Sequence, residues 1–138
     1  MASRETILSA IRAHPLASAP LPDLGGNWIT YPDRAKQFAE SLAFVGGRSV
    51  TADSLDAARR VLAETPAVAA AKRTVSFVDG LGETNIPWDT IADPHALADV
   101  DVAVVPGQFA VAENGAIWVT DAKIKHRAIL FIDRKSVV

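Results

Sequence analysis

The sequence predicts a mixed α/β domain built around a parallel sheet. Three observations support this prediction. Helix and strand patterns alternate along residues 32–78. Residues 101–106 contain, after Asp101, a continuous apolar run of strand length, which is typical of a strand buried on both faces. Asn114-Gly115 separates two further apolar runs, which is a strong signal for a β-hairpin.

Residues 1–22 are expected to form a helical arm and a linker ahead of the domain. Ser3 can cap a short helix with one apolar face, and Pro15 ends it. The stretch from there to residue 22 is rich in Pro, Ala and Ser, a composition typical of exposed linkers. The α/β domain is then expected over residues 23–132.

Helix caps, proline positions and apolar spacing predict the elements of that domain. In chain order they are a helix from Pro32–Asp33 to Gly46–Gly47, a strand over 48–51, a helix from Asp53 or Ser54 to Pro66, a strand over 74–78, a loop over 80–87, the buried strand over 101–106, hairpin strands over 109–112 and 116–120, and an amphipathic element over 125–132.

The last six residues, 133–138, follow this final element without a turn or a cap. They match the translation of a common sequencing adapter read through to a stop codon. We therefore expect native sequence to end near Ile132 and the six residues to be a non-native tail. A near-identical longer chain that continues through the same six residues would refute this expectation.

Composition narrows the class of protein. The 138 residues are 49% hydrophobic and 22% charged, enough for one domain with a packed core. A net charge of -2 without a run of Lys and Arg argues against nucleic-acid binding. The lack of cysteine excludes disulfides, thiolate zinc sites and iron–sulfur ligands in this chain. With no signal peptide and no apolar run near ~20 residues, a cytoplasmic protein without membrane association is expected.

Two other sequence features could indicate a binding site, one for a dinucleotide and one for a metal ion, but neither has the spacing that such a site requires. Gly80-Leu-Gly82 follows a strand, as in dinucleotide-binding loops, but Asn85 stands where the third glycine is needed. Pro87 also comes too early for a helix to open there, so an exposed loop is expected. The three histidines lie far apart in sequence with no metal-ligand spacing, and no metal site is expected.

Glu113 is the candidate catalytic residue. It lies between the two apolar runs of the hairpin, where a buried charge is costly unless it has a partner or a role. A carboxylate held at the tip of a core strand suits acid–base catalysis, nucleophilic attack or ligand orientation. The alternative is that Asn114-Gly115 is simply a turn and that Glu113 is its polar neighbour.

The phrase Phe109-Ala-Val-Ala-Glu-Asn-Gly-Ala116, within residues 99–119, resembles the signature of the lactate-utilisation (LUD) domain family. Residues 3–12 and 38–47 are similar to the corresponding segments of its protein C branch. Asn114 and Ala116 replace the more usual threonines. Members of the family also continue well past the end of this chain.

The resemblance implies a NagB/RpiA/CoA-transferase-like fold, a sheet with helices packed on both faces. It also implies participation in the oxidation of L-lactate, or another small hydroxy acid, to pyruvate or its equivalent. The iron–sulfur clusters would be held by partner oxidoreductase subunits, with no cofactor in this chain. The mechanism of the protein C branch does not carry over residue by residue. Our own site prediction is Glu113 as the catalytic residue, with Asn114, Gly115 and Gly107 as ligand-binding residues.

Two rival interpretations remain open. Glu113-Asn114-Gly115 is also similar to the Ser-Glu-Asn-Gly motif of class I CoA transferases, in which the glutamate attacks a thioester, although Ala112 replaces the serine here. The chain could instead be a non-catalytic scaffold subunit that keeps the fold. The sequence leaves homo-oligomerisation open, although an exposed sheet edge would favour pairing with another copy.

Overall fold

The computed structural model describes residues 2–14, 19–132 and 135–138 and divides the chain into two compact units, residues 1–30 and 31–138. The first unit contains helix α1 (Ala2–Ala13). This helix begins ahead of Ser3, so Ser3 lies inside it and does not cap it as predicted. The second unit carries the remaining elements.

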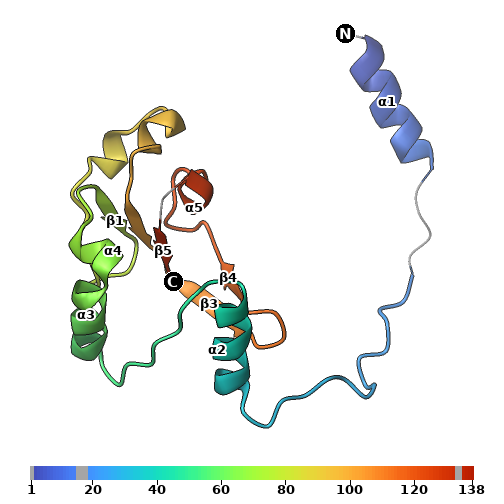
Figure 1. Ribbon diagram of the computed structural model, residues 1–138. Coiled ribbons are helices and arrows are strands. Elements are labelled where there is room, and N and C mark those ends of the chain that lie inside the picture. The colour runs from blue at the N-terminus through green and yellow to red at the C-terminus, as the bar shows by residue number, and fades with distance from the viewer. Residues whose placement is uncertain (1, 15–18, 133–134) are drawn as a thin grey trace. The chain divides into compact units, whose positions relative to one another are not determined.

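The second unit contains two small sheets and several short helices (Figure 1). In chain order its elements are α2 (Arg34–Phe44), α3 (Leu55–Glu64), α4 (Pro66–Ala69), β1 (Thr74–Ser76), the 3-10 helices η1 (Trp88–Thr90) and η2 (Pro94–Leu97), β2 (Val102–Val104), β3 (Gly107–Val111), β4 (Ala116–Val119), α5 (Ile129–Ile132) and β5 (Lys135–Val137).

Local capping explains where the two longer helices begin and end. Asp33 accepts a hydrogen bond from the amide of Lys36 and caps α2, and Ser54 caps α3 in the same way. Beyond the end of α2, Gly46 adopts a φ of 86° and the Gly47 amide donates to the Leu42 carbonyl. These predicted starts and the predicted glycine end of α2 are confirmed.

The strand predicted over residues 48–51 is wrong. The segment is irregular and exposed, and it pairs with no strand among the described residues. Its one large apolar side chain, Val50, is exposed, so the segment has no apolar face to bury.

Pro66 was predicted to end the helix that follows. Helix α3 stops at Glu64, and Pro66 opens the short helix α4, a position that suits its fixed φ.

The larger sheet has the order β1-β2-β5, and both pairings are parallel. Every residue of β2 is buried, which confirms the prediction for this run. Its side chains alternate between the two faces. Val102 and Val104 meet Leu62 of α3, whereas Ala103 belongs to a cluster on the opposite face.

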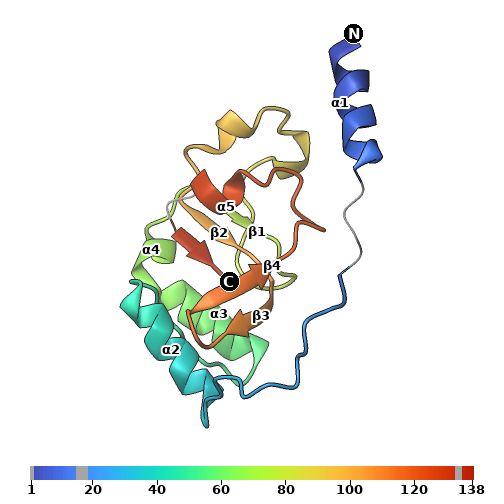
Figure 2. The ribbon, with the colours of Figure 1, turned by 90° about the vertical axis from the view of Figure 1, so that its right-hand side faces the viewer.

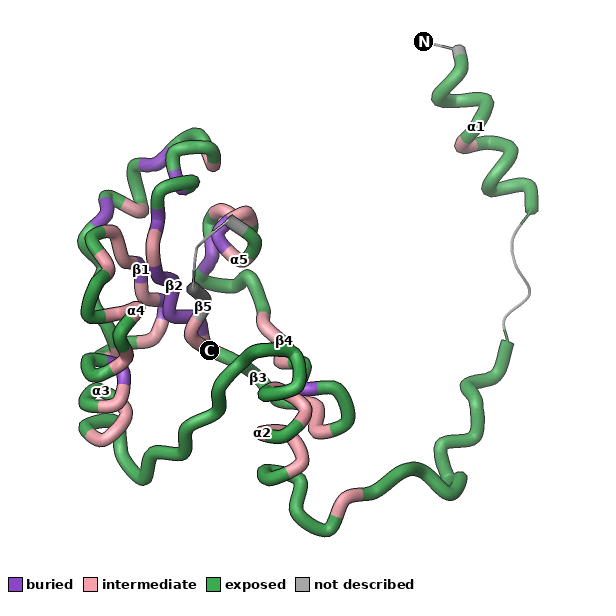
Figure 3. The backbone as a smooth tube through the Cα atoms, viewed as in Figure 1, coloured by how far each residue is buried: buried purple, intermediate pink, exposed green. Residues whose placement is uncertain are grey.

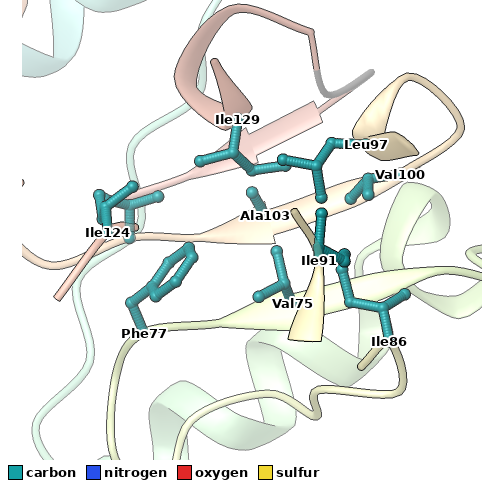
Figure 4. Close-up of a cluster of buried hydrophobic side chains, with 10 residues drawn as sticks. Val75, Phe77, Ile86, Ile91, Leu97, Val100, Ala103, Ile124 and Ile129 are labelled. Carbon is teal, nitrogen blue, oxygen red and sulfur yellow. The ribbon is translucent and has the colours of Figure 1, made fainter. Parts of the chain in front are cut away.

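That second cluster is the main core of the protein (Figure 4). It includes Leu97 and Ile129, neither of which has exposed surface. Figure 1 shows the resulting layers, with α3 and α4 on one side of the sheet and α5 on the other. The structure is therefore a mixed α/β fold in which the central strand is covered on both faces.

The loop over residues 80–87 was predicted and is present, and it has a structural task. It folds back along the outer edge of β1. Asn85 receives a hydrogen bond from the Thr74 amide through Oδ1 and donates through Nδ2 to the Lys72 carbonyl. The Ser76 amide donates to the Thr84 hydroxyl. The polar side chains of this loop therefore take the place of a neighbouring strand.

The amphipathic element predicted over residues 125–132 is mostly a loop, and only its end, α5, is helical. Lys125 and His126 both direct side-chain nitrogens to the Ile91 carbonyl, at 2.9 and 2.8 Å. Ile124 and Ile129 are buried beside this contact, so the segment is fixed by tertiary packing more than by helix formation.

In the predicted tail, residues 135–137 form β5 and pair with β2, while residues 133 and 134 lie outside the described residues. The provenance of the tail remains a prediction.

The hairpin strands β3 and β4 form a separate antiparallel sheet. The prediction that they are interior strands is wrong, because β3 is almost entirely exposed and β4 alternates between exposed and half-buried residues (Figure 3). Even the largest side chain of β4, Trp118, is 58% exposed. Among the described residues the hairpin does not pair with the parallel sheet. Its strands therefore lie at the surface of the unit.

Candidate functional site

The turn between β3 and β4 carries three of the four predicted site residues. Gly115 adopts a φ of 71°, the left-handed conformation that glycine favours. Its amide donates to the Val111 carbonyl at 3.0 Å, and Asn114 Oδ1 accepts from the Ala116 amide at 3.0 Å. The predicted hairpin is confirmed, and its turn spans residues 112–115, one residue more than the predicted strand ends leave.

Helix α2 packs directly against this turn (Figure 2). The Ser41 hydroxyl donates to the Ala112 carbonyl at 2.8 Å. Gly115 is buried against the helix backbone, and a Cβ at that position would lie only 2.8 Å from the Leu42 nitrogen. Only a glycine permits this approach, so the residue that shapes the turn also allows the helix to dock.

Glu113 is exposed, contrary to the prediction of a buried carboxylate between interior strands. The physical reason is that β3 and β4 form their own small sheet, which leaves their turn at the surface. The side chain borders an open, shallow depression between α2 and the turn. This depression is lined by Gln37, Glu40, Ser41, Phe44, Val45, Glu113 and Asn114.

The depression is acidic at its rim and partly apolar. Glu40 and Glu113 both line it, and none of the lining residues is basic. Lys36 approaches Glu40 at 3.9 Å, but both side chains are well exposed and such a pair is weak. Phe44 is 92% exposed. Two carboxylates without a lining cation repel anions such as a hydroxy acid or a phosphate-bearing thioester, and attract cations.

Gly107, the fourth predicted site residue, lies at the other end of the hairpin. It pairs with Val119, whereas the turn begins after Val111. At the rise of a β-strand this separation is roughly 13 Å. A Cβ on Gly107 would lie 2.8 Å from Ile117 Cγ2, so packing within the hairpin explains this glycine. The structure does not bring Gly107 together with Glu113.

Ser41 and Glu40 were not identified from the sequence. Apolar spacing predicts the helix that carries them, but no local pattern relates either residue to a turn more than seventy positions further along. The Ser41–Ala112 contact is a consequence of tertiary structure alone.

Histidine and carboxylate groups form no cluster larger than a pair elsewhere in the part of the chain that the structure describes. No group of three or more His, Cys, Asp or Glu side chains there could hold a metal ion. His126 stacks edge-on against Trp88, with ring centroids 5.9 Å apart, and binds the Ile91 carbonyl. Its contacts are those of a packing residue. Of the helices described, none has the length and apolar character needed to cross a membrane.

Fold and site together define a mixed α/β protein whose conspicuous surface feature is a hairpin turn held by a helix. Comparison of the chain with known protein families, curated proteins and solved structures found no significant match.

Proposed function

We propose that this chain is a lactate-utilisation protein of the LUD family's protein C branch. In this proposal it is a cytoplasmic α/β domain of the NagB/RpiA/CoA-transferase type. It serves as a component of an iron–sulfur-dependent complex that oxidises L-lactate to pyruvate, and partner subunits hold the clusters. The proposal rests on the resemblance of the phrase from Phe109 to Ala116, which forms an ordered hairpin held by helix α2.

Within that complex we assign the chain a non-catalytic, structural role. The observation that carries this assignment is the exposure of the Glu113 carboxylate beside Glu40 at an open depression. Acid–base catalysis by a carboxyl group relies on burial to bring its pKa toward the operating pH, and an acyl-forming glutamate needs a groove that excludes water. The surroundings of Glu113 supply neither a basic lining residue nor enclosure.

The test is growth on L-lactate as sole carbon source by the source organism with the gene deleted. Wild-type protein and the Glu113→Gln variant should restore growth equally, and extracts should show equal lactate-dependent dye reduction. If Glu113 were catalytic, the variant would lose at least ~10²-fold in rate. Normal growth of the deletion strain on lactate would reject the lactate function itself.

The CoA-transferase alternative makes a separate prediction. If Glu113 formed an acyl intermediate, hydroxylamine added after an acyl-CoA would inactivate the protein. The modified residue would be Glu113. In the structure, Ala112 occupies the position of the motif serine and contributes its carbonyl to the α2 contact. We expect no hydroxylamine-sensitive intermediate.

A further inference from the structure

The hairpin is a two-stranded sheet with two open edges. In the described part of the chain, β3 and β4 pair only with each other. An isolated two-stranded sheet is marginally stable in water, and unpaired edge amides and carbonyls readily accept a further strand. The hairpin therefore has the geometry of a sheet that another strand would extend.

The edge of β1 shows how this chain covers a sheet edge when it remains unpaired. There the loop that follows β1 supplies Thr84 and Asn85, whose side chains bond the strand's backbone. Among the residues that the structure describes, neither outer edge of the hairpin has side-chain cover of this kind; the Ser41 contact reaches only the turn. The chain thus covers the outer edge of β1 with polar side chains and leaves the edges of the hairpin without such cover.

The hairpin also lacks the features that discourage pairing. Neither Gly107–Val111 nor Ala116–Val119 contains a charged residue or a proline. Phe109 and Trp118 are cross-strand partners whose rings stack in parallel, with centroids 5.8 Å apart and planes 5° apart. They remain 57% and 58% exposed, so a large aromatic surface lies in water beside an open edge.

Charge differs between the two ends of β4. At the turn end lie the carboxylates of Glu40 and Glu113. The segment that leaves the other end, residues 121–127, carries three basic side chains and one acidic one. Two of the basic side chains are ion-paired, Lys123 with Asp79 and Arg127 with Asp121, so Lys125 supplies the excess positive charge at this end. Figure 1 shows α2 at the turn end and the chain departing toward α5 from the opposite end. An antiparallel pairing of two β4 strands would bring acidic and basic ends together twice.

We propose that a second copy of this chain pairs its β4 antiparallel with β4 about a twofold axis, giving a continuous sheet in the order β3-β4-β4-β3. The uncharged strands place no like charges opposite each other, and the Phe109–Trp118 pairs of both copies line one face. The β4 edge is favoured because the acidic turn and the segment that carries Lys125 lie at the two ends of that strand.

Sedimentation equilibrium of the full chain tests this interface. The apparent mass of the wild-type protein should approach twice its 14.6 kDa as the concentration is raised to ~100 μM. Trp118→Lys, which places a charge on the exposed edge, should weaken dimerisation at least ~10-fold. Trp28→Lys is the matched control, because Trp28 is 62% exposed but lies in the other unit. Circular dichroism verifies that both variants fold.

Charge and proximity give independent readouts. Glu113→Lys should also weaken the dimer, and added salt should do so in the wild-type protein. Because the chain has no cysteine, Ala116→Cys introduces a unique thiol in β4, and a flexible bismaleimide should join two copies. Ala63→Cys, exposed in α3, should not crosslink.

A monomeric wild-type protein over this concentration range overturns the proposal. So does a dimer that Trp118→Lys and Trp28→Lys affect equally, or one that crosslinks through Ala63→Cys but not Ala116→Cys. If Trp118→Lys fails to fold, the cysteine pair decides the question in an otherwise native sequence.

Discussion

The Ser41 hydroxyl of α2 donates a hydrogen bond to the Ala112 carbonyl of the hairpin turn at 2.8 Å, across 71 positions of sequence. Together with the close approach of Gly115 to Leu42, this contact connects a helix near the start of the second unit to a hairpin near its end. The position of the turn, and so of Glu113, depends on these contacts.

Replacing Gly115 by alanine should be strongly destabilising. The new Cβ would lie 2.8–3.0 Å from the backbone of Ser41 and Leu42, in addition to the cost of a φ of 71°. We expect the free energy of unfolding to fall by about 2–4 kcal/mol in urea denaturation. Gly46→Ala is the control, because its φ is 86° but a Cβ there meets nothing within 4 Å. It should cost only about 1 kcal/mol, and equal losses would contradict the close packing of α2.

Ser41→Ala should lower the free energy of unfolding by about 1 kcal/mol, the usual contribution of one partly buried hydrogen bond. The amide of Gly115, which bonds within the turn, should exchange with deuterium faster as the turn loosens. Ser49→Ala, on an exposed segment, should change stability by less than about 0.5 kcal/mol. An unchanged Gly115 exchange rate would show that the turn is stable without the Ser41 hydrogen bond.

Asn85→Ala should expose the edge of β1. The substitution removes the acceptor of the Thr74 amide and the donor to the Lys72 carbonyl, so a loss of about 1–3 kcal/mol is expected. Asn85→Asp keeps an oxygen for Thr74 and loses only the donor, so it should cost less. Hydrogen exchange at Thr74 should accelerate in the alanine variant and stay slow in the aspartate variant. The reverse order would argue against this edge cover.

The carboxylate of Asp93 should titrate below its ordinary pKa of 3.8. The main cause is the backbone amide of His95, which donates to Oδ1 at 2.9 Å, followed by the His95 ring. A lowered folded-state pKa means that the contribution to stability is present above pH 3.8 and is lost as the pH falls through the folded value. Carboxyl carbon NMR titration, compared with a peptide spanning residues 91–98, should show the lower midpoint.

His95→Ala provides the control for Asp93. It keeps the backbone donor and removes the ring, so the pKa of Asp93 should return only part of the way. A complete return would show that the ring, and not the amide, is responsible.

Patterns within a few residues predicted most of the secondary structure. Asp33 and Ser54 start helices because their side chains satisfy free backbone amides, and Gly46 and Gly115 stand where the chain needs a positive φ. The uninterrupted apolar run around Ala103 predicted a strand buried on both faces, since no polar side chain there would face water. Each of these signals is local, and each was confirmed.

Tertiary structure alone decided where the hairpin lies and what surrounds Glu113. An apolar strand is equally compatible with a core sheet and with a small surface sheet, because periodicity does not say which neighbour a strand will find. Here β3 and β4 pair only with each other among the described residues, so the carboxylate expected in the interior is exposed. The partners of Ser41 and Asn85 are backbone groups brought near by folding, which no local composition encodes.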